Sequence, residues 1–107
     1  MKPIRIGLLG YGTVGSGVAE VLQANREEIR RRAGRGIEVA RIAVRNVARV
    51  RALVGESVAV TDDPYEVVLD PEIDIVAELI GGTEIARDLV LEAVAQRKHV
   101  VTANKAL

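Results

Sequence analysis

The chain lacks several residue types: none of its 107 residues is cysteine, tryptophan or phenylalanine. Without cysteine, disulfide bonds, thiolate metal sites and cysteine nucleophiles are excluded, and the one histidine, His99, cannot form a histidine metal cluster. We therefore expect no metal centre. The two tyrosines leave almost nothing to stack on bases, so we also expect no nucleic-acid partner.

Long hydrophobic runs are also missing. The apolar run that begins at residue 4 ends at Gly10, and it is too short and too rich in glycine for a signal peptide or a membrane span. We expect no membrane contact and a cytoplasmic location. The length suits one domain of ordinary size, which we place at residues 1–107.

The net charge is zero, but its distribution is uneven, because most basic residues precede residue 55 and most acidic residues follow it. A basic half can face an anion. The interpretation that we favour for the arginine cluster is a solvated, electrostatically favourable C-terminal end of a helix. The cluster comprises Arg26, Arg30, Arg31, Arg32 and Arg35.

Short apolar runs alternate with longer amphipathic stretches along the whole chain. Strands are predicted over residues 4–9, 37–44, 73–80 and 99–102, with a brief edge strand at 58–60. Helices are predicted over residues 13–33, 47–54, 64–69 and 84–98. This alternation predicts an α/β fold, a Rossmann-like doubly wound parallel sheet with helices on both faces in three α/β/α layers.

A glycine-rich turn joins the first predicted strand to the first helix, and residues 10–15 have the sequence GYGTVG. In this strand-turn-helix context the G-x-G-x-x-G pattern is typical of dinucleotide binding. Gly10 makes the tight turn, Gly12 lets the backbone approach a pyrophosphate, and Gly15 permits close packing of helix on strand. Thr13 and Val14 lie at the helix start, where free N–H groups favour an anion. The alternative, a glycine turn without a ligand, is disfavoured.

The end of the second strand bears on the choice between NAD and NADP. NAD-preferring sites have Asp or Glu there, whereas this chain has Arg45, and Glu38 lies at the opposite end of the strand. Arg45, together with Arg49 and Arg51, can pair with a 2′-phosphate. We therefore predict NADP, with NAD left open. The alternative is that these arginines only solvate a loop.

Two further loops are expected at the same sheet edge, because all parallel strands end there. Gly81 and Gly82 follow the third long strand and would let the backbone approach the nicotinamide half of a cofactor. Lys105 follows the last strand, which ends at Thr102. Its cation either handles the proton of a substrate oxygen or is simply solvated. Glu78 either faces the ligand or pairs with a neighbouring arginine, and we favour the pair.

Three segments together resemble the start of homoserine dehydrogenase. They are IGLLGYGTVGSG at residues 6–17, ELIGGT at 78–83 and VTANKAL at 101–107. The combination of G-x-G-T-V-G with a late T-A-N-K is specific, and the likeness extends over essentially the whole chain. That family interconverts homoserine and aspartate 4-semialdehyde with NAD(P), on the way to threonine and methionine.

The resemblance implies roles for particular residues. The turn residues Gly10, Gly12, Thr13, Val14 and Gly15 would bind the cofactor. Other implied roles are 2′-phosphate recognition by Arg45, cofactor or substrate-loop contacts from Thr102 and Asn104, and a catalytic, proton-handling role for Lys105.

Family members continue into a substrate and dimerisation domain with acidic residues and a second essential lysine. The resemblance therefore implies that residues 1–107 are the NAD(P)-binding fragment of a homo-oligomeric enzyme and have little turnover alone. Two alternatives stay open. One is a non-catalytic dinucleotide-sensing module, and the other is a two-domain reductase of the glucose-fructose oxidoreductase type. In the latter the lysine usually has an E-K-P context, whereas here Lys105 lies between Asn104 and Ala106.

Overall fold

A five-stranded parallel sheet forms the centre of the computed structural model, with the strand order β3-β2-β1-β4-β5. The structure describes residues 2–80 and 84–102, and of residues 13 and 14 it describes the backbone alone. The strands are β1 (Ile4–Leu9), β2 (Ile37–Ala43), β3 (Ala59–Thr61), β4 (Ile75–Glu78) and β5 (His99–Thr102).

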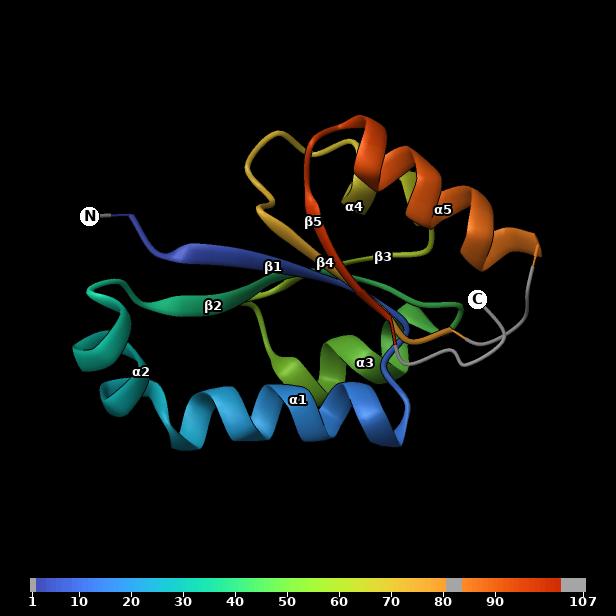
Figure 1. Ribbon diagram of the computed structural model, residues 1–107. Helices are drawn as coiled ribbons and strands as arrows, with labels where there is room; N and C mark the ends of the chain where they lie inside the picture. The colour runs from blue at the N-terminus through green and yellow to red at the C-terminus, as the bar shows by residue number, and fades with distance from the viewer. Residues whose placement is uncertain (1, 81–83, 103–107) are drawn as a thin grey trace.

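Helices cover both faces of this sheet (Figure 1). One face carries α1 (Thr13–Ala24), α2 (Arg26–Ala33) and α3 (Val47–Val54), and the other carries α4 (Tyr65–Val68) and α5 (Glu84–Ala95). The predicted doubly wound α/β/α fold is therefore confirmed. The chain runs from β1 outward to β3 and then returns to place β4 on the other side of β1, so the strand order reverses beside β1.

The core consists of two apolar clusters, one on each face of the sheet. Leu8 and Ile42 pack with Val50 of α3 on one face, and Leu9 packs with Val67 and Leu89 of α4 and α5 on the other. The side chains of β1 thus alternate between two buried faces, because a central parallel strand is covered on both sides. This explains the continuous apolar run in the first strand.

The first helical stretch differs from the prediction, because it is two helices instead of one. The break lies at Asn25, whose φ and ψ are −107° and 18°. Its side-chain Nδ2 donates to the Val21 carbonyl at 2.9 Å. Asparagine side chains compete with the helix for backbone groups in this way, so α2 begins in a new direction (Figure 1).

The last predicted helix is also shorter than expected. It ends at Ala95, and Arg97 has a left-handed φ of 63°. Lys98 lies beyond the helix, and its Nζ donates to the carbonyls of Asp70 and Ile73 at 2.5 and 2.9 Å. These carbonyls precede β4, so the ammonium group anchors the turn after α5 to the amino edge of the sheet.

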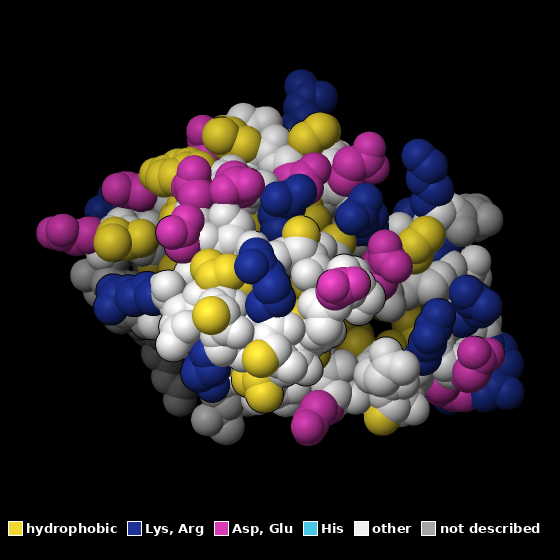
Figure 2. Space-filling model, turned by 180° about the vertical axis from the view of Figure 1, so that it is seen from behind, with side chains coloured by type: hydrophobic (Ala, Val, Ile, Leu, Met, Phe, Trp, Pro, Cys, Tyr) yellow, Lys and Arg dark blue, Asp and Glu magenta, His cyan; other side chains and the backbone are white. Residues whose placement is uncertain are grey.

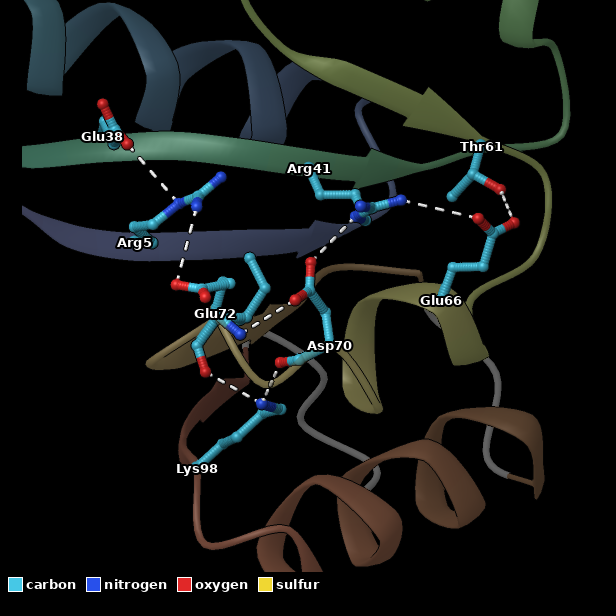
Figure 3. Close-up of polar contacts among 9 residues, drawn as sticks. Arg5, Glu38, Arg41, Thr61, Glu66, Asp70, Glu72 and Lys98 are labelled. Carbon is cyan, nitrogen blue, oxygen red and sulfur yellow. Dashed lines mark hydrogen bonds and ion pairs between the residues drawn. The ribbon is translucent and has the colours of Figure 1, made fainter.

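Arg41 is the charged residue inside the otherwise apolar strand β2. Its guanidinium pairs with Asp70 at 3.2 Å and with Glu66 at 3.5 Å, and Glu66 accepts a hydrogen bond from Thr61 (Figure 3). Asp70 and Glu66 belong to the segment around α4, which lies over this part of the sheet. The charge is tolerated in the strand because carboxylates of the covering layer neutralise it.

The arginine cluster lies around α2. Arg30, Arg31 and Arg32 occupy the last turn of that helix, as the favoured interpretation predicted, but Arg26 is its first residue and lies at the opposite end. Arg31 and Arg32 are 75% and 81% exposed and both pair with Glu28. Figure 2 shows basic side chains around the end of the molecule that carries α2 and acidic side chains over the end that carries α5. The uneven charge of the sequence is therefore also uneven in space.

Candidate functional site

The carboxyl ends of the central strands lie in register at one edge of the sheet. Leu9, the last residue of β1, is the partner of Glu78 in β4 and of Ala43 in β2. Glu78 in turn is the partner of Thr102, the last residue of β5. The segments that follow these strands therefore start side by side, as the sequence predicted for a parallel sheet. Among them, Gly81, Gly82, Asn104 and Lys105 lie outside the described residues.

The glycine turn begins with Gly10, whose φ of 102° falls in the left-handed region that favours glycine. Its N–H donates to the carbonyl of Ala43 at 2.9 Å. A Cβ on Gly10 would lie 3.3 Å from the carbonyl carbon and oxygen of Leu79. The turn thus packs directly against the backbone that leaves β4, so both the conformation and the contact favour glycine.

Gly15 lies in the first turn of α1 and is buried. A Cβ there would be 3.1 Å from the Gly10 oxygen and 3.4 Å from Cδ1 of Tyr11. The contact with the Gly10 oxygen is tighter than most Cβ atoms show, and the contact with Tyr11 is at the short end of ordinary van der Waals distances. The missing side chain lets α1 start immediately above the end of β1, which is the packing role that the G-x-G-x-x-G pattern predicts for this glycine.

The start of α1 has the features of an anion site. Its N-cap is Gly12, so no side chain caps the helix, and its first turn contains no acidic residue. By contrast α2, α4 and α5 each have an acidic residue in the first turn. The first N–H groups of a helix have no partner within the helix, and its dipole makes them attractive to negative charge.

Space beside Gly12 is open as far as the described residues go. A Cβ on Gly12 would meet none of their atoms within 4 Å, although Gly10 and Gly15 on either side are tightly packed. A diphosphate can therefore approach the backbone at Gly12 closely, and the residues present fit the diphosphate of a dinucleotide.

Arg45 follows β2 at the same edge and is exposed. The adjoining backbone is held in place, since Val44 N donates to Thr61 O at 2.8 Å and the Asn46 side chain caps α3 by accepting from Arg49 N at 3.1 Å. Arg51 differs from Arg45 and Arg49, the other two arginines predicted to pair with a 2′-phosphate, because its Nη2 donates to the Val60 carbonyl at 3.3 Å. That contact gives Arg51 a structural role between α3 and β3.

Glu38 lies at the amino end of β2, away from the glycine turn. Its carboxylate pairs with Arg5 of β1 at 3.5 Å, and Arg5 also faces Glu72 at 4.0 Å (Figure 3). The expectation that Glu38 lies at the wrong end of the strand for the ribose is therefore confirmed.

The contacts of Glu78 contradict one prediction from the sequence. The expected ion pair with an arginine is wrong: within residues 2–80 and 84–102, Glu78 has no ion pair. The side chain is 0% exposed and accepts hydrogen bonds from Thr102 Oγ1 and Ile80 N, each at 2.7 Å. Neither partner could be identified from the sequence, because one is a backbone group and the other belongs to β5.

Comparison with known proteins decides the family. A family model described as homoserine dehydrogenase, NAD binding domain, matches residues 10–107. The chain belongs to the homoserine dehydrogenase family. The match covers the glycine turn and the ends of β2, β4 and β5, and it places the chain at the NAD-binding domain of that family.

Relatives support the same assignment. A homoserine dehydrogenase of Methylobacillus glycogenes is 59% identical over the whole chain, which covers 26% of that protein. One of Pseudomonas aeruginosa is 54% identical over the whole chain, which covers 24% of it. A crystal structure of a homoserine dehydrogenase from Thiobacillus denitrificans matches with a TM-score of 0.90 and 62% identity, over 98% of this chain and 24% of that one. The chain thus spans about a quarter of the length of these homoserine dehydrogenases.

The described part of the chain contains no group of three or more His, Cys, Asp or Glu side chains that could hold a metal ion. Its helices also include none with the length and apolar character needed to cross a membrane.

Proposed function

We propose that residues 1–107 form the cofactor-binding domain of a homoserine dehydrogenase, which interconverts homoserine and aspartate 4-semialdehyde. The observation that carries the proposal is the open approach to Gly12 at the uncapped start of α1, beside the strand where the sheet order reverses. Dinucleotides bind at such switch points in open α/β sheets. The proposal includes the homo-oligomeric state implied by the family resemblance.

The sheet order divides the proposed site into two halves. The diphosphate lies at the turn of Gly10, Gly12, Thr13, Val14 and Gly15, the adenosine half on the β2 side, and the nicotinamide half on the β4 and β5 side. When bound, NAD(P) donates or accepts the hydride. We assign nicotinamide-side contacts to Gly81, Gly82, Thr102 and Asn104.

We propose that NADP is the preferred cofactor and that Arg45, at the end of β2, binds its 2′-phosphate. Replacing Arg45 with alanine is expected to weaken NADP binding about tenfold, the effect of losing one charge-assisted pair, and to leave NAD binding unchanged. Calorimetric titration of the chain with each nucleotide measures both constants.

The matched control is Arg87→Ala, an exposed arginine on α5, which should change neither constant. Markedly tighter binding of NAD than of NADP by the unsubstituted chain would contradict the proposal. Equal weakening of both nucleotides by Arg45→Ala would also contradict it.

We propose Lys105 as the catalytic residue that holds and moves the proton at the substrate oxygen. In a protein with the full length of the relatives, Lys105→Met is expected to lower kcat about 10²- to 10⁴-fold, the usual contribution of a general acid or base. NADPH binding should be retained. Steady-state kinetics and nucleotide titration on the same preparation separate the two effects.

Lys2→Met, at an exposed lysine beside the amino edge of the sheet, is the matched control and should leave kcat unchanged. A Lys105→Met protein with unchanged kcat would rule out the assignment. The 107-residue chain alone is expected to bind NADPH but not to oxidise homoserine, and turnover at ordinary enzymatic rates would show that it holds a complete site.

A further inference from the structure

Glu78 is the one charged side chain that is fully buried among the described residues. A buried carboxylate is costly unless hydrogen bonds replace its hydration. Both oxygens have such a bond: Oε1 accepts from the Thr102 hydroxyl and Oε2 from the Ile80 N–H, each at 2.7 Å. The short distances are typical of hydrogen bonds to a carboxylate.

The two bonds join neighbouring strand ends. Thr102 is the last residue of β5, and Ile80 lies two residues beyond the end of β4. The Oε2 bond closes the chain back on itself over residues 78–80, so the path of the backbone leaving β4 is determined by this side chain. The Oε1 bond ties that segment to the end of β5.

The same segment supports the glycine turn. Leu79 N donates to Leu9 O at 2.9 Å, and the Leu79 carbonyl is the group that a Cβ on Gly10 would meet at 3.3 Å. The Glu78 side chain therefore links the ends of β4 and β5, while the adjacent Leu79 backbone bonds the end of β1. The chain continues from β4 and β5 into the segments 81–83 and 103–107, which carry the proposed nicotinamide-side residues.

We infer that Glu78 is a positioning residue for the nicotinamide half of the cofactor, an inference that rests on the proposed function. Its carboxylate sets the spacing between the strand ends of β4 and β5, on which the nicotinamide side of the site is built. The adenosine half is held on the β2 side, which neither of these two Glu78 hydrogen bonds reaches.

The test compares two ligands on the 107-residue chain: NADPH, and 2′-phospho-ADP-ribose, which lacks the nicotinamide ring. Glu78→Met keeps a side chain of similar length but removes both acceptors. We expect it to raise the Kd for NADPH about tenfold, as the loss of buried hydrogen bonds implies, while the Kd for 2′-phospho-ADP-ribose changes less than about twofold. The nicotinamide fluorescence of bound NADPH should also be lower in Glu78→Met than in the unsubstituted chain.

Glu78→Gln is the conservative variant and guards against misfolding. Its amide oxygen can accept from Ile80 N, and its NH₂ can donate to the Thr102 hydroxyl. We expect this variant to restore most of the difference between the two ligands. The matched control, Glu72→Gln, makes the same change at the opposite edge of the sheet and should alter neither Kd.

Thr102→Val removes the other partner of the Oε1 bond. Combined with Glu78→Met, its effect on the Kd for NADPH should be smaller than the sum of the two single effects, because both substitutions remove the same bond. If Glu78→Met and Glu78→Gln weaken both ligands equally, or neither, Glu78 has no selective positioning role and the inference is overturned while the proposed function stands. If the unsubstituted chain binds neither ligand, the inference and the proposed function are both overturned.

Discussion

Replacing Gly12 with alanine is expected to remove dinucleotide binding while leaving the fold intact. The N-cap conformation of Gly12, with φ −77°, is open to alanine, and the added Cβ would meet no atom of residues 2–80 and 84–102 within 4 Å. The methyl group would instead occupy the space through which a diphosphate approaches the backbone. We expect Kd for NADPH to rise at least about 100-fold, because several N–H contacts would be lengthened together.

Calorimetry with NADPH and thermal unfolding on the same preparations separate binding from stability. The matched control is Gly17→Ala, because a Cβ at Gly17 in α1 also meets nothing within 4 Å. Alanine there should raise stability by about 0.5–1 kcal/mol, since glycine is a poor helix residue, and leave Kd unchanged. Full NADPH affinity in Gly12→Ala would refute the placement of the diphosphate at this turn.

Replacing Gly7 with alanine is expected to destabilise the fold. Gly7 lies in the central strand β1, and a Cβ there would be 2.5 Å from Cγ1 of Val67 and 3.3 Å from Cγ2 of Ile73. Val67 is fully buried and β-branched, so it has little freedom to move aside. We expect the free energy of unfolding to fall by about 1–3 kcal/mol, the usual cost of overpacking a core. Urea denaturation measures it.

A second substitution tests whether this contact is the cause. Val67→Ala alone should destabilise the chain by leaving a cavity, but in the Gly7→Ala background the new methyl group occupies part of that space. We expect the double variant to be more stable than the sum of the single effects predicts, by about 1 kcal/mol or more. Strict additivity would mean that the Gly7 and Val67 positions do not compete for space.

The fold could be predicted well from the sequence because the patterns that indicate strands and helices are local. Apolar runs, helical spacing and the stop at Gly55 depend on residues near one another in the chain, and β1, α3 and β5 were predicted with their observed bounds. The strand predicted over residues 73–80 is limited to Ile75–Glu78. Two other boundaries that failed depended on particular side chains. Asn25 bonds back to Val21 and divides a helix, and Lys98 leaves α5 to bind carbonyls before β4.

The partners of charged side chains could not be predicted from the sequence, for a different reason. Arg41 and Asp70 are separated by 29 positions, and Glu78 and Thr102 by 24. Which residues meet over such distances depends on strand order and register, and these are decided when the sheet assembles. For Glu78 this changed the interpretation from an ion pair to a hydrogen-bonded link.

The sequence alone therefore determined the alternation of strands and helices and the glycine turn between β1 and α1, since both depend on residue types at short spacings. It also indicated the family, through motifs at residues 6–17, 78–83 and 101–107. Only the tertiary structure decided that the end of β4 lies between those of β1 and β5, that the Leu79 carbonyl packs against Gly10, and that Glu78 bonds Thr102. The physical reason is that hydrogen bonds and steric contacts act between neighbours in space, and parallel strands become neighbours only through the packing of the whole sheet.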